Sequence, residues 1–152
     1  MKRIEVGDPA PDVSLKTHQG DTIALSSFQG EKAVVLFFYP MDGTPVCTKE
    51  ACGFRDSYED FVEAGAAVIG ISGDTAARHQ AFASEHRLQY LLVDDHDGQI
   101  RKAFGVPKTL GFMPGRVTYV IDKQGIVRHV FSSQLSASKH VEEALSCLRS
   151  SE

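Results

Sequence analysis

The apolar run at residues 33–39, which ends at Pro40, limits the possible folds of this chain more than any other segment. The run is rich in β-branched and aromatic residues and contains no charged residue. A strand whose two faces are both apolar is typical of the centre of a sheet that is covered by helices. The sequence therefore predicts a central strand at residues 33–39, buried on both sides.

Strand and helix patterns alternate along the rest of the chain, with turn residues between the first two and the last two strands. Expected strands lie at residues 13–16, 22–25, 67–72, 88–93, 117–122 and 126–131. Expected helices lie at residues 45–63, 76–87, 97–104 and 136–148. This order predicts an α/β fold in which helices flank a mixed central β-sheet, with an N-terminal β-hairpin, in a single domain of residues 1–152.

The charge of the chain argues against several classes of partner. Lys and Arg number 16 against 20 Asp and Glu, which gives a formal net charge of −4, and the basic residues form no dense cluster. We therefore expect no nucleic acid and no membrane surface as partner. The N-terminus reaches Asp8 and Pro9 before the apolar core of a signal peptide could form, so we expect a cytoplasmic protein.

Three cysteines, Cys47, Cys52 and Cys147, are too few and odd in number for a secreted disulfide framework. Such cysteines serve as small buried hydrophobes, metal ligands or redox groups. The spacing of Cys47 and Cys52 departs from common zinc sites, and we expect His79 and His86, seven residues apart on one helix, to lie on a solvated face. We expect no metal and no cofactor.

Cys47 falls in the first turn of the helix expected at residues 45–63, after Thr44 as N-cap and Pro45 as the first helical residue. Backbone N–H groups and the positive end of the helix dipole stabilise a thiolate at such a position. Thr44 is the nearest further hydrogen-bond donor. The alternative is that Cys47 only packs under the sheet, because free cysteine is often buried.

Cys52 follows Cys47 by five residues within the same expected helix. In an intact α-helix two such residues have Cα atoms roughly 8.6 Å apart. This separation exceeds the roughly 7 Å limit for a disulfide. A Cys47–Cys52 bond therefore requires the first turns of the helix to unwind.

The stretch Pro40-x-x-x-Thr44-x-x-Cys47 matches the P-x-x-x-T-x-x-C signature of the peroxiredoxins. Cys52 resembles the resolving cysteine of the peroxiredoxin Q group, also called bacterioferritin comigratory proteins. The resemblance extends over nearly the whole chain, through segments in the same order at Gly7-x-x-Ala10-Pro11, Phe28-Gln29-Gly30, Gly70-Ile71-Ser72-x-Asp74 and Gly115-Arg116-x-Thr118-Tyr119-x-Ile121-Asp122. Val46 departs from the glycine that is common before the nucleophile in this group.

The resemblance implies a thioredoxin-like fold and a thiol-dependent peroxidase that reduces hydrogen peroxide and organic hydroperoxides. Cys47 would attack the hydroperoxide and become a sulfenic acid, and Cys52 would condense with it to an intramolecular disulfide. Thioredoxin or a glutaredoxin-type reductant would reduce this disulfide. The alternatives are a peroxide sensor or redox-regulated binding module with little turnover, and a scaffold without catalysis.

The resemblance also implies roles for residues around Cys47. Thr44 would hold the peroxide oxygens, Pro40 would shield the thiolate, and Arg116 would supply positive charge. Glu50 would orient Arg116, although an exposed glutamate in the first turns of a helix is equally ordinary. We expect Cys147 to be a bystander, with crosslinking or a C-terminal resolving role as alternatives, and a monomer with a dimer as the alternative.

Overall fold

A mixed sheet with the strand order β5-β4-β3-β8-β9 forms the centre of the computed structural model, which describes residues 3–106, 108–109 and 113–150. β3 pairs in parallel with β4, and β4 in parallel with β5, whereas β8 is antiparallel to both β3 and β9. The strand bounds are β3 Ala33–Phe38, β4 Ala66–Ser72, β5 Leu91–Asp94, β8 Val117–Ile121 and β9 Val127–Ser132.

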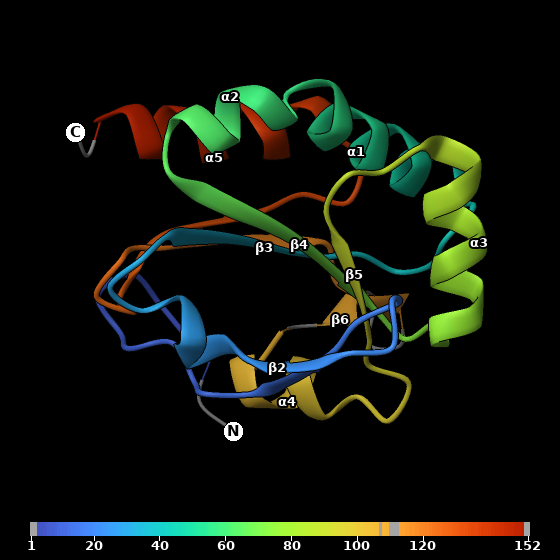
Figure 1. Ribbon diagram of the computed structural model, residues 1–152, viewed down its shortest axis with the longest axis horizontal. Helices are drawn as coiled ribbons and strands as arrows, with labels where there is room; N and C mark the ends of the chain where they lie inside the picture. Colours follow the sequence, from blue (N-terminus) through green and yellow to red (C-terminus); the bar gives the residue numbers. More distant parts are fainter. Residues whose placement is uncertain (1–2, 107, 110–112, 151–152) are drawn as a thin grey trace.

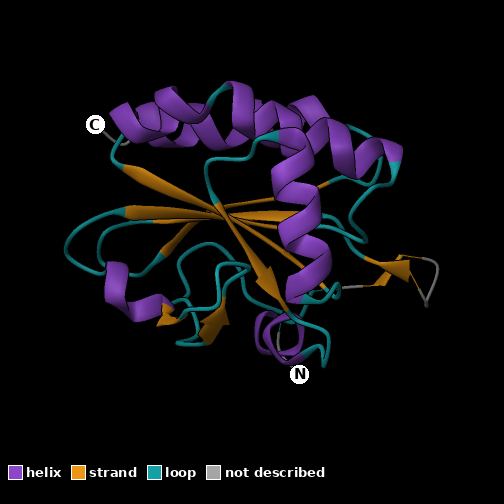
Figure 2. Ribbon diagram, turned by 45° about the vertical axis from the view of Figure 1, so that its right-hand side comes forward, coloured by secondary structure: helices purple, strands orange, loops and turns teal. Residues whose placement is uncertain are grey.

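Helices cover both faces of this sheet (Figures 1 and 2). One face carries α1, α2 and α5, with α3 standing beside them, and the other face carries α4 and the hairpin of β1 and β2. Two further short strands, β6 and β7, form a separate antiparallel pair. The bounds are β1 Ser14–Lys16, β2 Thr22–Ala24, η1 Leu25–Phe28, α1 Pro45–Asp56, α2 Tyr58–Glu63, α3 Ala76–His86, α4 Gln99–Phe104, β6 Lys108–Thr109, β7 Met113–Pro114 and α5 Ala137–Ser150.

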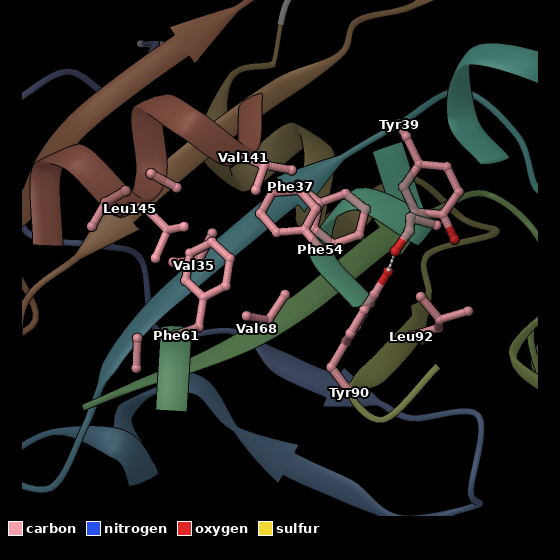
Figure 3. Close-up of a cluster of buried hydrophobic side chains, with 14 of the residues drawn as sticks. Val35, Phe37, Tyr39, Phe54, Phe61, Val68, Tyr90, Leu92, Val141 and Leu145 are labelled. Atoms are coloured by element: carbon pink, nitrogen blue, oxygen red, sulfur yellow. Dashed lines mark hydrogen bonds between the residues drawn. The ribbon is translucent and has the colours of Figure 1, made fainter. Parts of the chain in front are cut away.

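The two faces of β3 enter two different apolar cores, as expected for a strand whose side chains alternate. Val35 and Phe37 pack with α1 and α5, and the Phe37 ring stacks on Phe54 at a centroid distance of 4.4 Å (Figure 3). Leu36 and Phe38 belong to the second core, against α4 and the hairpin. The prediction of a central strand buried on both sides is therefore confirmed.

The predicted α/β order and the N-terminal hairpin are also confirmed, with three local differences. The helix expected at residues 45–63 is divided at Ser57, which leaves helical geometry (φ −99°, ψ 9°) and so separates α1 from α2. Leu25 begins a 3-10 helix instead of extending β2, and the strand expected at 88–93 begins at Leu91. The pairing of β6 with β7 was not expected.

Within the described ranges, none of the helices combines the length and the apolar character needed to cross a bilayer.

Candidate active site

The end of β3 and the start of α1 position Cys47. The chain leaves β3, passes Pro40, turns at Gly43 with a φ of +87°, and enters α1 with Thr44 as N-cap and Pro45 as the first residue. Cys47 therefore lies in the first turn of α1, where its side chain is 1% exposed. At this position the thiol faces the positive end of the helix dipole.

Thr44 occupies the N-cap by position, but its hydroxyl does not cap the helix. The hydroxyl donates to the carbonyl oxygen of Met41 at 3.1 Å. The sequence predicted a capping hydroxyl, and the difference arises because the turn at Gly43 brings the Met41 carbonyl within reach. The Thr44 side chain therefore does not occupy the N–H groups of the first turn.

Arg116 lies directly before β8 and places its guanidinium against Cys47. Nη2 is 3.2 Å from the Cys47 Sγ, Nη1 donates to the Glu50 Oε1 at 2.6 Å, and Nε donates to the Gln134 carbonyl at 3.0 Å. The side chain is 4% exposed. Three partners thus fix a planar cation beside the buried sulfur, where it favours a thiolate.

Glu50 lies one turn after Cys47 and is fully buried, unlike an exposed glutamate of the first turns. Burial raises the pKa of Glu50 to about 7, although the Arg116 guanidinium acts in the opposite direction. Its second oxygen, Oε2, has no hydrogen-bond partner within the part of the chain that the structure describes. Glu50 is therefore a carboxyl poised between its charged and its neutral form.

His140 of α5 lies behind Glu50, with Nδ1 3.5 Å from the Glu50 Oε2. Its Nε2 donates to the Ser133 carbonyl at 2.8 Å, and its Nδ1 accepts from the Thr118 hydroxyl at 2.7 Å. These partners suit the neutral ring. Burial lowers the pKa of His140 to about 4, which also keeps the ring neutral. The sequence pattern placed no functional weight on His140, which continues the buried row of Cys47, Arg116 and Glu50.

Cys52 lies five residues after Cys47 in α1, about 1.4 turns further along the helix, and is partly exposed. Its Sγ is 3.8 Å from Nδ1 of His86, the last residue of α3. Cys147 of α5 packs partly against the apolar core, and burial raises the pKa of its thiol. Cys47 and Cys52 are both thiols in an intact α1.

A second polar cluster anchors the loop that leads to Cys47. Asp42 accepts a hydrogen bond from the Tyr39 hydroxyl at 2.5 Å, and its other oxygen is 2.7 Å from the His79 Nδ1. The His79 Nε2 donates to the Val93 carbonyl at 2.9 Å. The backbone N–H of Asp42 donates to Asp74, in the turn after β4, at 2.8 Å, so the loop is tied to this turn, to α3 and to β5.

The expectation that His79 lies on a solvated face is wrong, because the side chain is fully buried. The missed signal is its spacing of three residues from Phe82, which puts both on the buried side of α3. Donor atoms of Asp42, Asp74 and His79 lie within 4.8 Å of one another, a spacing that could suit a metal ion. Hydrogen bonds within the protein already engage these atoms.

The chain was compared with protein families and with known proteins. The model of the AhpC/TSA family matches residues 6–130. The chain belongs to the AhpC/TSA family. It is 49% identical over 148 residues to the chloroplastic peroxiredoxin Q of Triticum aestivum (97% of this chain, 68% of that protein). It is 48% identical over 149 residues to that of Sedum lineare (97% and 80%).

Solved peroxiredoxin structures share the fold. A peroxidoxin of Mycobacterium tuberculosis, BcpB, has a TM-score of 0.91 and 38% identity, with 99% of both chains covered. The C47S mutant of the Xylella fastidiosa PrxQ has a TM-score of 0.90 and 25% identity, with 99% of both chains covered. This member of the AhpC/TSA family is therefore a thioredoxin-fold peroxiredoxin of the Q group and a thiol-dependent peroxidase, so a sensor or a scaffold is not favoured.

The relatives also correct one expectation. The peroxiredoxins Q of Triticum aestivum, Sedum lineare and Arabidopsis thaliana are named chloroplastic, which contradicts the cytoplasmic location expected from the sequence. The physical reason is that the composition of a folded domain carries no compartment address.

Proposed function

We propose that Cys47 is the peroxidatic cysteine. The observation that carries this proposal is the buried Cys47 Sγ at 3.2 Å from the Arg116 Nη2 in the first turn of α1. The thiolate attacks the terminal oxygen of a hydroperoxide and the O–O bond breaks. Cys47 becomes a sulfenic acid, and the departing alkoxide or hydroxide takes up a proton to leave as an alcohol or water.

The residues around Cys47 support this step in different ways. Arg116 stabilises the thiolate and the negative charge that develops on the peroxide oxygens. The N–H groups of the first turn of α1 donate to these oxygens, the Thr44 hydroxyl oxygen accepts from the peroxide O–H, and Pro40 limits the access of water to the sulfur. Glu50 is a positioning residue, because it holds the Arg116 guanidinium through Nη1.

We further propose that Cys52 resolves the sulfenic acid by forming an intramolecular disulfide with Cys47. Both residues lie in the intact α1, whose spacing is too wide for a disulfide, so α1 must open first. Thioredoxin or a glutaredoxin-type dithiol then reduces the bond.

The substrates proposed are hydrogen peroxide and organic hydroperoxides. A related Xanthomonas campestris protein is described by its alkyl peroxide reduction activity, which supports this range. We propose that residues 1–152, of which 1–2, 107, 110–112 and 151–152 lie outside the described residues, act as one domain in a monomer. The plant relatives support a plastid as its compartment.

Mapping the cysteines after oxidation tests the proposed cycle. The reduced protein receives one equivalent of hydrogen peroxide at neutral pH, the remaining thiols are alkylated, and the peptides are weighed. We expect a Cys47–Cys52 disulfide with Cys147 alkylated, and the same disulfide in Cys147→Ser. A Cys47–Cys147 bond would overturn the role of Cys52, and persistence of the Cys47 thiol would overturn the role of Cys47.

A further inference from the structure

The contact between Cys52 and His86 is not used by any step described so far. The Cys52 Sγ lies 3.8 Å from the His86 Nδ1, within reach of a hydrogen bond that involves sulfur. The two residues come from different helices, since Cys52 is in α1 and His86 ends α3. The His86 side chain is 24% exposed, so a proton on the ring can exchange with water.

His86 contacts both α1 and its own helix α3. Arg55 of α1 donates from Nη1 to the His86 carbonyl at 2.8 Å, which ties the end of α3 to α1. The Phe82 ring packs edge-on against the imidazole at a centroid distance of 4.7 Å. The first contact holds the end of α3 beside α1, and the second packs against the ring whose Nδ1 lies 3.8 Å from the Cys52 sulfur.

Glu85 influences which ring nitrogen of His86 carries the proton. Its Oε2 lies 3.8 Å from the His86 Nε2, on the side of the ring opposite Cys52. A carboxylate at this distance favours a proton on Nε2. The lone pair of the neutral ring is then on Nδ1, where it can accept the Cys52 S–H.

Two other charged or titratable groups that lie near Cys52 are Arg55 and Tyr90, and neither can serve as a base. Arg55 is a permanent cation whose charge interacts with Cys52 and whose partner is Asp56. The buried Tyr90 phenol stays neutral, because burial raises its pKa well above the usual range. Among Arg55, Tyr90 and His86, only His86 has a side chain of a type that gains and loses a proton near neutral pH.

We propose that His86 is the general base of the resolving step, an inference that rests on the proposed role of Cys52. In the closed α1 the Cys52 S–H transfers its proton to the His86 Nδ1. Once α1 has opened, the Cys52 thiolate attacks the sulfur of the Cys47 sulfenic acid. The S–S bond forms as the S–O bond breaks. The departing hydroxide takes up one proton, which the imidazolium returns through solvent, so the products are a disulfide, water and neutral His86.

The size of the expected effect follows from ordinary thiol chemistry. A thiol without help is only a few per cent ionised at neutral pH, and the thiolate is the nucleophile. A base that brings most of the thiol into the reactive form therefore accelerates the attack by about tenfold at neutral pH. The gain disappears at high pH, where hydroxide ionises the thiol anyway.

Quenched-flow mass spectrometry of the full chain separates the two chemical steps, which is useful because the chain has no tryptophan to report them by fluorescence. Reduced wild type and His86→Phe receive one equivalent of hydrogen peroxide. A sulfenic acid trap and a thiol alkylating agent are added at increasing times, between about pH 6 and pH 9. The phenylalanine keeps a ring against Phe82 but has no base.

We expect equal rates of Cys47 oxidation in both proteins. Conversion of the sulfenic acid to the Cys47–Cys52 disulfide should be about tenfold slower in His86→Phe near pH 7 and should approach the wild-type rate near pH 9. The matched control is His96→Phe, since His96 is exposed and pairs with Asp94, and it should leave both steps unchanged. Glu85→Gln, an exposed change, should slow the disulfide step about twofold and provides a test if His86→Phe does not fold.

The outcomes distinguish this inference from the proposed cycle. Absence of a Cys47–Cys52 disulfide in wild type would overturn the cycle itself. Equal disulfide rates and equal pH profiles in wild type and His86→Phe, with the cycle intact, would overturn the role of His86 alone. A faster disulfide step in His86→Phe would also overturn it, because His86 would then hold Cys52 in place and not activate it.

Discussion

The carboxyl group of Glu50 lies at a buried position, where its charged form is disfavoured. The carboxyl is fully buried between Arg116 and His140, and among the described residues only one of its two oxygens has a hydrogen-bond partner. A lone buried carboxylate costs several kcal/mol, which the adjacent guanidinium offsets only in part. The arrangement makes sense if the carboxyl is needed to hold Arg116 against Cys47.

Glu50→Gln should change how stability depends on pH. The pKa of Glu50 rises from the ordinary 4.5 to about 7 on folding. Between these two pH values the folded protein holds a proton on Glu50 that the unfolded chain has released. The contribution of Glu50 to the free energy of unfolding therefore falls as the pH rises from 4.5 to about 7. Relative to wild type, the variant should gain stability between about pH 5 and pH 7.5, at roughly 1.4 kcal/mol per unit of pKa difference.

Urea unfolding at a series of pH values measures this difference. His140, whose lowered pKa makes stability fall as the pH drops from 6.5 toward 4, is present in both proteins, so its contribution largely cancels. A constant difference between wild type and Glu50→Gln over the whole range would contradict the raised pKa of Glu50.

Arg116→Met should slow the oxidation of Cys47 by about a hundredfold, because it removes a preorganised cation from a buried reaction centre. Glu50 can then take up a proton, so we expect the fold to persist, with an unchanged circular dichroism spectrum. The measurement is the second-order rate of thiol loss with hydrogen peroxide. Arg128→Met, an exposed arginine of β9 paired with Asp122, is the control and should react at the wild-type rate.

At the scale of elements, α1 must be both well packed and able to open. Gly53 allows a close approach to α5, since a Cβ at this position would lie 3.1 Å from the Val141 Cγ2. The Tyr90 hydroxyl donates to the Ala51 carbonyl at 2.7 Å, in the middle of α1 (Figure 3). These contacts hold α1 closed and so influence how fast Cys47 and Cys52 can meet.

Tyr90→Phe should loosen α1 without changing the sulfur chemistry. Loss of one buried hydrogen bond destabilises the closed helix by about 1 kcal/mol. The disulfide should consequently form about fivefold faster, while Cys47 is oxidised at an unchanged rate. Quenched-flow mass spectrometry measures both rates, with Tyr58→Phe as the control; a disulfide rate equal to that of wild type would mean that opening of α1 does not limit the step.

Oxidation itself should open α1 selectively. Because the intact helix holds Cys47 and Cys52 too far apart to bond, the disulfide form must lose helical hydrogen bonds between residues 45 and 56. Amide hydrogen exchange should increase there and stay slow in β3, β4 and β8. Matching exchange in the reduced and oxidised proteins would contradict the proposed opening.

At the scale of the whole molecule, two apolar cores on either side of the sheet pack tightly against the central strands. Gly70 of β4 shows this, because a Cβ there would lie 2.7 Å from the Phe37 Cζ and 2.9 Å from the Leu92 Cδ2. Contacts this short require the neighbouring side chains to move.

Gly70→Ala should therefore lower the free energy of unfolding by about 1 to 3 kcal/mol. Gly73→Ala is the matched control, since its Cβ would meet nothing closer than the Asp95 carbonyl oxygen at 3.9 Å. We expect the control to stay within about 0.5 kcal/mol of wild type. Equal urea midpoints for the two variants would show that the sheet can absorb the extra methyl group.

The sequence by itself determined what depends on neighbouring residues. Several features can be read from short stretches of sequence, because the pattern that predicts them spans only a few residues. They are the buried run of residues 33–39, the start of α1 at Pro45 and the spacing of Cys47 and Cys52. The division of the helix at Ser57 was missed because both halves keep the same apolar side. The peroxiredoxin signature is local in the same sense.

Only the tertiary structure decided which distant residues meet. Arg116 contacts Cys47 across 69 residues of sequence. The sequence pattern alone would make Arg116 a solvated turn residue after Gly115, and only the resemblance to the peroxiredoxins indicated its role; the structure supplies the contact itself. The burial of Glu50 and the approach of His86 to Cys52 likewise arise where α1 packs against other elements. Such contacts depend on how whole elements bury their apolar faces, and no short stretch of sequence contains that information.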